Sequence, residues 1–381
     1  MHSHRRRRAA LLVGGTLTAA ALAAPSALAD TYAPQHPVGV GLDPVSIAVD
    51  SGQPDVYTAD FGNDVSLLVG DPLTPAGTVS LGANGSGVAV DPSTHKVYVT
   101  TGDNTTLGGG SVDELSGNPL SVITSVQPTG ATQDANMAAV AVDPATHDVY
   151  AVDAANGTVS VYSGDLAAIA TVPVGDQPVA VAIDSGTHTA YVVDQGPDEV
   201  SVVDLKTNKV IKTIRVGFVP DAVAVDPSTH DVYVANGADG TLSVIAGSTL
   251  KVTATVPVGD DPSGVAVDPR RHTVYATNLL DAQVTVLTGD RLRATHTIPV
   301  GDFPQAATVD PSTHELYVAN GGDATVTPVK VAVGGMTPPP GGGNGGHGHG
   351  QPHHGHGQHG HDQHEHGHAG RGHGDHRHHK H

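Results

Sequence analysis

The segment DPSTHDVYVAN at residues 226–236 returns almost unchanged as DPSTHELYVAN at residues 310–320, and altered copies occur at five further places in the 381-residue chain. The copies are marked by tyrosines spaced 41, 52, 41, 42, 42 and 42 residues apart: Tyr57, Tyr98, Tyr150, Tyr191, Tyr233, Tyr275 and Tyr317. An aspartate stands seven residues before each one: Asp50, Asp91, Asp143, Asp184, Asp226, Asp268 and Asp310. A period held over seven copies indicates a repeat architecture.

Each copy contains four short runs of β-branched or alternating residues separated by turn residues, as at Gly264–Asp268, Thr273–Asn278, Gln283–Leu287 and Ala294–Val300. Four strands in each repeat, with no helical period, predict one antiparallel blade of a β-propeller. We therefore expect an all-β, seven-bladed propeller over residues 30–333. A solenoid is the competing repeat fold, but it needs capping segments, and the sequence shows none.

The two ends of the repeat array predict how the ring closes. The last copy offers only three strands: Gln305–Asp310, Glu315–Asn320 and Ala324–Val333. The N-terminal segment Tyr32–Val40 contains HPVG at 36–39, which matches IPVG at 298–301 at the end of a repeat. We expect this N-terminal strand to complete the last blade, which removes the exposed edges of an open array.

The strings YVAN at 233–236, YVAN at 317–320 and YATN at 275–278, each after an Asp-Pro turn, resemble the repeat of YVTN-family β-propellers. The resemblance covers most of the chain, although the strings drift in the first four blades, as in YTAD at 57–60. It implies an extracytoplasmic protein of the surface-layer or cell-surface type, in a family with some DNA-binding members. The repeat residues of that family are structural, so no catalytic residue is carried over.

The N-terminus predicts export. Four arginines, Arg5–Arg8, precede the uncharged run Ala9–Ala24, and the small triplet Ala27–Ala29 follows. This pattern is typical of a signal peptide over residues 1–29, through either the general secretory or the twin-arginine route. The alternative is a retained membrane anchor. After signal removal we expect no membrane span.

Composition excludes several classes of function. The chain has no cysteine and therefore no disulfide or thiolate metal site. Its formal net charge is −20, which disfavours binding to nucleic acid. No Gly-x-Ser-x-Gly elbow, phosphate loop or His-Glu-x-x-His helix occurs in the sequence. An enzyme is therefore disfavoured, and no cofactor is required.

The C-terminal end changes composition abruptly. Proline and glycine dominate residues 334–346 and predict a linker, and residues 347–381 are rich in histidine with no large apolar residue, which predicts a disordered tail. Closely spaced neutral imidazoles are good ligands for Zn, Ni and Cu, with affinity falling below pH about 6.5. The alternative is a soluble spacer that binds anionic cell-wall polymer or nothing. The candidate metal ligands are His347, His349, His353, His354, His356, His359, His361, His364, His366 and His368.

The repeated side chains have structural interpretations. The Asp-Pro pairs suit tight turns, and we expect the tyrosines to pack between blades with their hydroxyls reaching a polar partner. Six histidines stand three residues before a tyrosine, and we interpret them as turn residues, too far apart for a metal site. They are His95, His147, His188, His230, His272 and His314.

Charge is divided between the two faces of the predicted ring. The loops between the second and third strands and the loops between blades open on one face, here called the acidic face. These loops contain many aspartates but no lysine or arginine, and both insertions of the second repeat, 104–110 and 130–135, lie there. The sequence predicts a site for a cationic ligand or protein partner there. The alternative is that aspartate simply favours turns. The candidate ligand-binding residues are Asp43, Asp176, Asp221, Asp260, Asp261 and Asp302.

These features favour a secreted or cell-surface propeller that acts as a binding or scaffold module, with a metal-binding tail. Two alternatives remain. One is an extracytoplasmic enzyme of the lactonase or lyase type, in which an acidic pocket supplies a general base. The other is a metal-sequestering protein in which the propeller only displays the tail.

Overall fold

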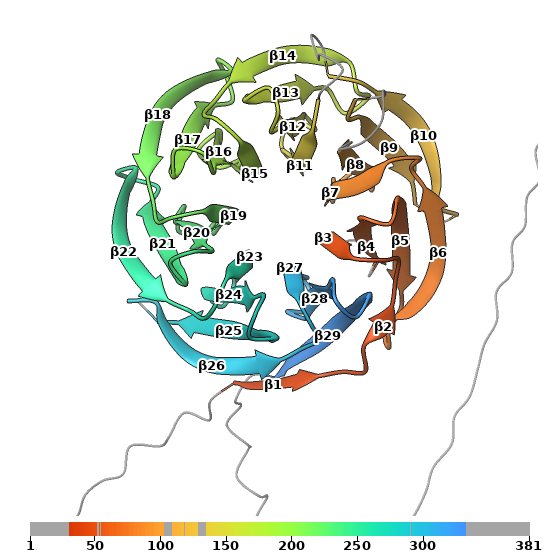
Figure 1. Cartoon of the computed structure of the whole chain (residues 1–381), viewed down its shortest axis with the longest axis vertical. Helices are drawn as coiled ribbons and strands as arrows, with labels where there is room; N and C mark the ends of the chain where they lie inside the picture. The colour runs from red at the N-terminus through yellow and green to blue at the C-terminus, as the bar shows by residue number, and fades with distance from the viewer. Residues whose placement is uncertain are drawn as a thin grey trace, which may run out of the picture. The chain divides into compact units, whose positions relative to one another are not determined.

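The computed structural model describes residues 30–332 except 52, 54, 103–108, 118, 129–134 and 290. The predicted signal peptide, linker and histidine-rich tail lie outside these residues. Within them there is no helix; seven four-stranded antiparallel sheets form a ring, which confirms the seven-bladed β-propeller and excludes a solenoid (Figure 1).

Six blades are each built from four consecutive strands, and blade 7 joins strands from the two ends of the described chain. Blade 1 has β3 (Pro44–Asp50), β4 (Asp55–Asp60), β5 (Asp64–Val69) and β6 (Thr74–Ser80); blade 2 has β7 (Asn84–Val90), β8 (Val97–Gly102), β9 (Val112–Ser116) and β10 (Ser121–Val126); blade 3 has β11 (Met137–Val142), β12 (Val149–Asp153), β13 (Thr158–Tyr162) and β14 (Ala168–Pro173); blade 4 has β15 (Pro178–Asp184), β16 (Thr189–Asp194), β17 (Glu199–Asp204) and β18 (Lys209–Arg215). Blade 5 has β19 (Pro220–Val225), β20 (Val232–Asn236), β21 (Thr241–Ala246) and β22 (Lys251–Pro257); blade 6 has β23 (Pro262–Asp268), β24 (Thr273–Asn278), β25 (Gln283–Thr288) and β26 (Arg293–Pro299); blade 7 has β27 (Pro304–Val309), β28 (Leu316–Asn320) and β29 (Thr325–Ala332), completed by β1 (Thr31–Pro34) and β2 (Val38–Gly39).

Ring closure occurs as the sequence predicts. Strand β1 pairs antiparallel with β29, with Thr31 opposite Ala332, and β2 continues the pairing with Val38 opposite Val326. The added strand is broken at residues 35–37, where the Gln35 N–H still donates to the Pro328 carbonyl (2.7 Å). Blade 7 therefore contains both ends of the described chain, and no outer edge of β29 is left unpaired along these two strands.

The hydrophobic core is divided into layers between neighbouring blades. Tyr57 and Leu67 of blade 1, for example, pack with Val97, Val99 and Leu115 of blade 2. The tyrosines are buried in these layers, as predicted. The Tyr98 hydroxyl reaches a polar partner, as predicted, because it donates to the Gly164 carbonyl (2.7 Å).

The expectation that every tyrosine hydroxyl finds a polar partner is wrong for one repeat tyrosine. The buried Tyr275 hydroxyl has none among the described residues. The Tyr275 ring packs edge-on against the ring of Tyr32 from the closing strand, with centroids 6.3 Å apart.

The inner strands are built from small residues because the blades converge on the axis. A Cβ placed on Gly264 of β23 would lie 2.9 Å from the Gln305 carbonyl oxygen of β27, and one on Gly87 of β7 would lie 2.9 Å from Ala139 Cα of β11. Backbone of adjacent blades therefore approaches closely at these positions, where only glycine fits without displacement.

Candidate functional site: the acidic face

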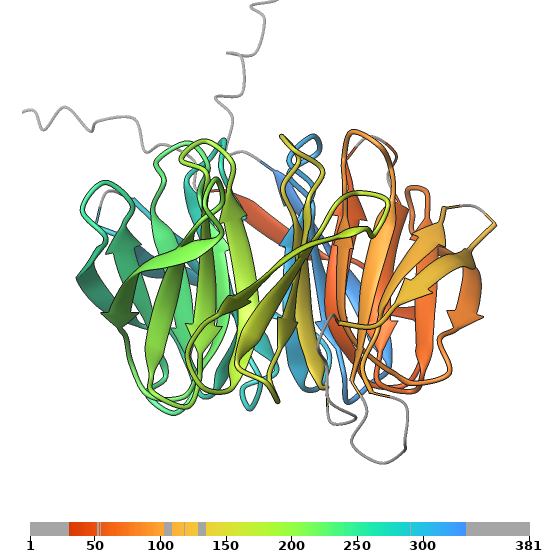
Figure 2. The ribbon, with the colours of Figure 1, turned by 90° about the horizontal axis from the view of Figure 1, so that it is seen from above.

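The loops between second and third strands and the loops between blades form the acidic face, at the lower edge of the ring in Figure 2. The other loops carry the repeated histidines and form the histidine face. Thr31 and Ala332 pair near the histidine face, so both ends of the described chain lie away from the acidic face. Parts of the two insertions, residues 103–108 and 129–134, lie outside the described residues.

A buried polar side chain at the end of the second strand ties the acidic-face loops of most blades together. In blade 5 the Asn236 amide accepts a hydrogen bond from the Gly217 N–H (3.1 Å) and donates one to Ser243 Oγ (3.0 Å). In blade 4 the equivalent residue is Asp194, whose carboxylate accepts from Ser201 Oγ (2.6 Å). The side chain thus links the loop that enters the blade to the third strand.

Two of these buried anchors are carboxyls with unusual titration. Burial raises the pKa of Asp194 to about 6, and hydrogen bonds from Ser201 and Gly175 counter this only in part. Burial likewise raises the pKa of Asp60 in blade 1 to about 6, against a hydrogen bond from Ser66 (2.7 Å). Both carboxyls are inaccessible to water, so ionising them costs solvation free energy.

In the five blades whose inner strand begins with proline, the two loops are also joined through the backbone. The first N–H after the second strand donates to the carbonyl before the proline of the inner strand, as from Phe61 to Asp43 (3.0 Å) and from Gly321 to Phe303 (2.9 Å). The pre-proline residues have left-handed φ angles near 50° in five blades: Asp43, Gln177, Val219, Asp261 and Phe303. The same backbone geometry therefore carries different side chains in different blades.

Three aspartates of the acidic face accept hydrogen bonds from the backbone of the neighbouring loop. Carboxylate oxygens of Asp239, Asp281 and Asp323 accept the backbone N–H groups of Phe218 (2.9 Å), Asp260 (2.9 Å) and Asp302 (2.7 Å), respectively. Each bond joins the loop that enters the blade to the loop after its second strand, 21 residues further on, so these three aspartates have a structural role that a tight turn does not explain.

The six predicted ligand-binding residues are only partly brought together. Asp221 and Asp261, from adjacent blades, both lie beside Gly237, and Gln195 donates to the Asp221 carboxylate (2.6 Å). Burial and the neighbouring Asp261 carboxylate raise the pKa of Asp221 to about 6. Asp43 accepts a hydrogen bond from Gln305 (2.8 Å). Asp176, Asp260 and Asp302 are exposed in separate blades.

Asp221 also lines the central channel, a cavity of about 260 Å³ surrounded by the inner strands. It is the one charged side chain among the described residues that line this cavity. The other lining residues are mainly small and apolar, and the uncharged polar ones are Ser46, Ser86, Ser263 and Gln305. The negative charge of the channel lining therefore lies at Asp221, in the inner strand of blade 5.

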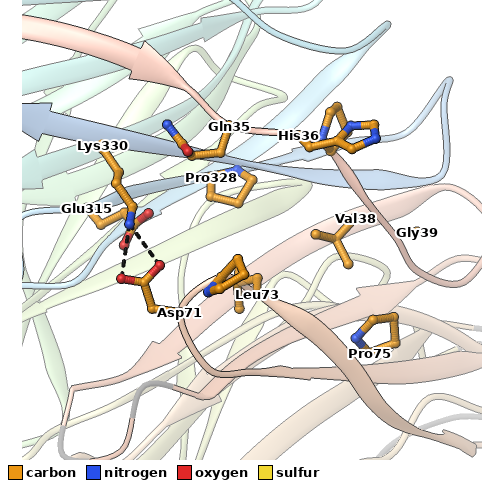
Figure 3. Close-up of a pocket in the computed structure, with 12 residues that line it drawn as sticks. Gln35, His36, Val38, Gly39, Asp71, Leu73, Pro75, Glu315, Pro328 and Lys330 are labelled. Carbon is orange, nitrogen blue, oxygen red and sulfur yellow. Dashed lines mark hydrogen bonds and ion pairs between the residues drawn. The ribbon is translucent and has the colours of Figure 1, made fainter.

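Two larger cavities lie at seams between blades, and none of the six predicted residues lines them. One of about 700 Å³ lies where the closing strand meets blade 1 (Figure 3). Lys330 Nζ contacts both carboxylate oxygens of Asp71 there (2.8 and 3.0 Å), beside apolar Val38 and Leu73. Another, of about 880 Å³, is lined by Arg271, His272 and Arg291 on the histidine face.

The histidines make contacts that the sequence interpretation missed. Each has a left-handed φ, as expected of a turn residue, but five of them also bind the buried repeat aspartate of the preceding blade through Nδ1, at 2.7–3.1 Å. The pairs are His95–Asp50, His147–Asp91, His230–Asp184, His272–Asp226 and His314–Asp268. Aspartate and histidine recur four residues apart in six of the seven repeats, which marks these positions, but the spacing does not show that each histidine reaches the preceding blade.

One pair shows the electrostatic consequence. Burial of Asp91 favours its neutral form, but hydrogen bonds from Ser93, Thr94 and His147 outweigh it and lower the pKa of Asp91 to about 2. The His147 ring is about half exposed, whereas the Asp91 side chain is fully buried. A solvent-facing histidine thus holds a buried carboxylate across the blade interface.

Phenylalanines are the second feature missed from the sequence. The chain has only three, and all are exposed on the acidic face: Phe61, Phe218 and Phe303. Apolar residues of this size are normally buried, so three exposed on one face indicate an interaction surface.

Comparison with known proteins shows the fold class and no more. No family model and no curated protein matches the chain. Among solved structures, Kuenenia stuttgartiensis Hydrazine Synthase is similar, with a TM-score of 0.67 and 17% sequence identity over 76% of this chain and 96% of that chain. The YVTN resemblance therefore stays a prediction, and the class established is the seven-bladed β-propeller.

Two further observations bear on the site. Within the described part of the chain, no group of three or more histidine, aspartate or glutamate side chains is placed to hold a metal ion. The same residues include no helix that is long and apolar enough to cross a bilayer.

Proposed function

We propose that this protein is a secreted or cell-surface β-propeller that binds a cationic ligand or protein partner on its acidic face. The observation that carries the proposal is the one-signed charge of that face. Its described loops contain no lysine or arginine, and Asp176, Asp260 and Asp302 are exposed there. The resemblance to YVTN repeats supports the extracytoplasmic location, and N-terminal sequencing of exported protein, expected to begin at Asp30, tests it.

Charge reversal tests the binding face. Replacing Asp260, Asp261 and Asp302 with lysine is expected to abolish binding of an oligolysine peptide, measured by titration calorimetry at low ionic strength. The substituted protein is expected to fold, because the Asp261 position carries valine or phenylalanine in other blades. Asp165→Lys on the histidine face, at an exposed residue paired only with Lys96, is the matched control. Unchanged affinity in the triple variant contradicts the proposal.

The histidine-rich tail is proposed to bind divalent transition metals independently of the propeller. Its residues supply many imidazoles at short spacing, which is the chemistry that Zn, Ni and Cu prefer. A titration of the full chain with Zn²⁺ is expected to show binding that weakens as pH falls below about 6.5, because protonated imidazole cannot coordinate. A chain that ends at Val333 is expected to bind no Zn²⁺ at the same concentrations. Equal binding by both chains contradicts the assignment to the tail.

A further inference from the structure

The exposed apolar residues of the acidic face occupy one arc of the ring. Phe218 is 63% exposed in blade 5, Leu280 is 64% in blade 6, Phe303 is 50% in blade 7, and Leu42 and Phe61 are 72% and 44% in blade 1. Blades 5, 6, 7 and 1 are consecutive because the ring closes between blades 7 and 1 (Figure 1). The exposed apolar groups therefore lie along one arc of four consecutive blades.

These side chains are presented by loops with defined structure. Phe303 lies over Gly322, where an added Cβ would be 2.7 Å from its ring, and the Gly322 N–H donates to the Asp302 carbonyl (3.0 Å). Leu42 packs in the same way over Gly62, whose N–H donates to the Leu42 carbonyl (3.0 Å). A surface held in this way loses little conformational entropy when a partner binds.

Three of these apolar residues have an aspartate next to them in the sequence. Asp302 precedes Phe303, Asp43 follows Leu42, and Asp281 follows Leu280. The Asp302 side chain is exposed, and no lysine or arginine occurs in the described loops of this face to neutralise it. A complementary surface must therefore supply both apolar groups and positive charge, and an arginine or lysine over a phenylalanine ring adds a cation–π contact.

We propose that this arc, the acidic-face loops of blades 5, 6, 7 and 1, docks a polypeptide segment of a partner protein in which basic and apolar side chains alternate. The inference rests on the proposed function and specifies the class of its partner. A second copy of this chain fits less well, because its own arc would bring aspartates against aspartates. A small inorganic cation would leave the phenylalanines uncovered.

Two peptides test the proposal on the full chain. One alternates lysine with leucine, the other alternates lysine with serine, and each carries a fluorescent label for anisotropy titration. We expect the lysine–leucine peptide to bind at least about tenfold more tightly. We expect Phe218→Ser combined with Phe303→Ser to remove most of that advantage. Ile211→Ser, at a residue 55% exposed on the outer strand β18, is the matched control and should have no effect.

The outcomes separate this inference from the function it rests on. Equal affinity for both peptides, unaffected by the phenylalanine substitutions, overturns the inference and leaves a purely electrostatic binding face. Binding of neither peptide overturns both. Concentration-dependent self-association in sedimentation that is lost in the Phe218→Ser, Phe303→Ser variant assigns the arc to a second copy and also overturns the inference.

Discussion

Replacing Asp194 with asparagine is expected to stabilise the propeller at neutral pH and to leave its stability near pH 4 almost unchanged. Asp194 is fully buried at the end of β16. Blades 5, 6 and 7 already carry asparagine at this position, and in blade 5 Asn236 satisfies the equivalent groups: it accepts from a loop glycine N–H and donates to a serine hydroxyl. The substitution therefore copies an arrangement that this fold already contains.

The size and sign of the effect follow from the raised pKa. Burial moves the pKa of Asp194 from 3.8 to about 6. One pKa unit corresponds to about 1.4 kcal/mol, so the cost of keeping this carboxylate ionised in the folded protein reaches about 3 kcal/mol. The cost is absent below pH about 4, where the group is protonated in both folded and unfolded chains, and complete above pH about 6. Stability of the native protein is thus lost as pH rises through this window.

Urea unfolding followed by far-ultraviolet circular dichroism between pH 4 and pH 8 measures this difference. Asp153→Asn is the matched control at the equivalent position of blade 3. There the carboxylate accepts the N–H groups of Asn136, Ala155 and Asn156 and the Asn156 side-chain amide, so an amide would place a donor against a donor. Asp153→Asn should therefore destabilise. If Asp194→Asn gains the same amount at pH 4 as at pH 8, or gains nothing at pH 8, the argument from buried ionisation is wrong.

Three further substitutions or truncations test the remaining structural claims. His147→Ala should lower the free energy of unfolding by about 1 kcal/mol at neutral pH, because it removes the bond to Asp91. The loss should vanish below pH about 2, where Asp91, with its lowered pKa, is protonated. Urea unfolding measures this difference, and His188→Ala is the control because its ring makes no such bond among the described residues. Deleting residues 30–39 exposes the edge of β29. The deletion should lower the melting temperature, measured by calorimetry, and promote association, measured by light scattering. An unchanged melting temperature contradicts the role of the closing strand. Gly264→Val should destabilise by about 1–3 kcal/mol through overpacking against blade 7, whereas Gly77→Ala, with open space around it, should be neutral in the same unfolding assay.

The fold was predictable because its information is periodic and local. Seven tyrosines, each seven residues after an aspartate, predict the number of blades. The last repeat lacks a fourth strand, which predicts that the N-terminal segment closes the ring. The contacts between repeats were not predictable in this way. The bond between His147 and Asp91 joins loops 56 residues apart, and it depends on how adjacent blades pack at the histidine face. Sequence spacing within one repeat does not contain that geometry.

The candidate site was predictable only as a face. Sequence placed the aspartates on the correct side of the ring. It did not distinguish Asp281 and Asp323, whose carboxylates accept a backbone N–H of the neighbouring loop, from Asp260 and Asp302, whose own backbone N–H groups donate those bonds. That distinction depends on which carboxylate oxygen meets which backbone N–H. The exposed phenylalanines were overlooked because each lies alone in sequence, and only ring closure places blades 7 and 1 side by side.

The two faces differ in what their side chains do for stability. On the histidine face the repeated side chains bond across blades, so substitution there loosens the ring. On the acidic face the loops are joined by backbone bonds and by side chains such as Asn236 and Asp323, whereas the pre-proline positions carry aspartate, glutamine, valine or phenylalanine with the same φ. The exposed side chains at and beside the pre-proline positions can therefore change with little cost to folding. A loss of binding after substitution of Asp302 or Phe303, with unfolding unchanged, can accordingly be assigned to recognition.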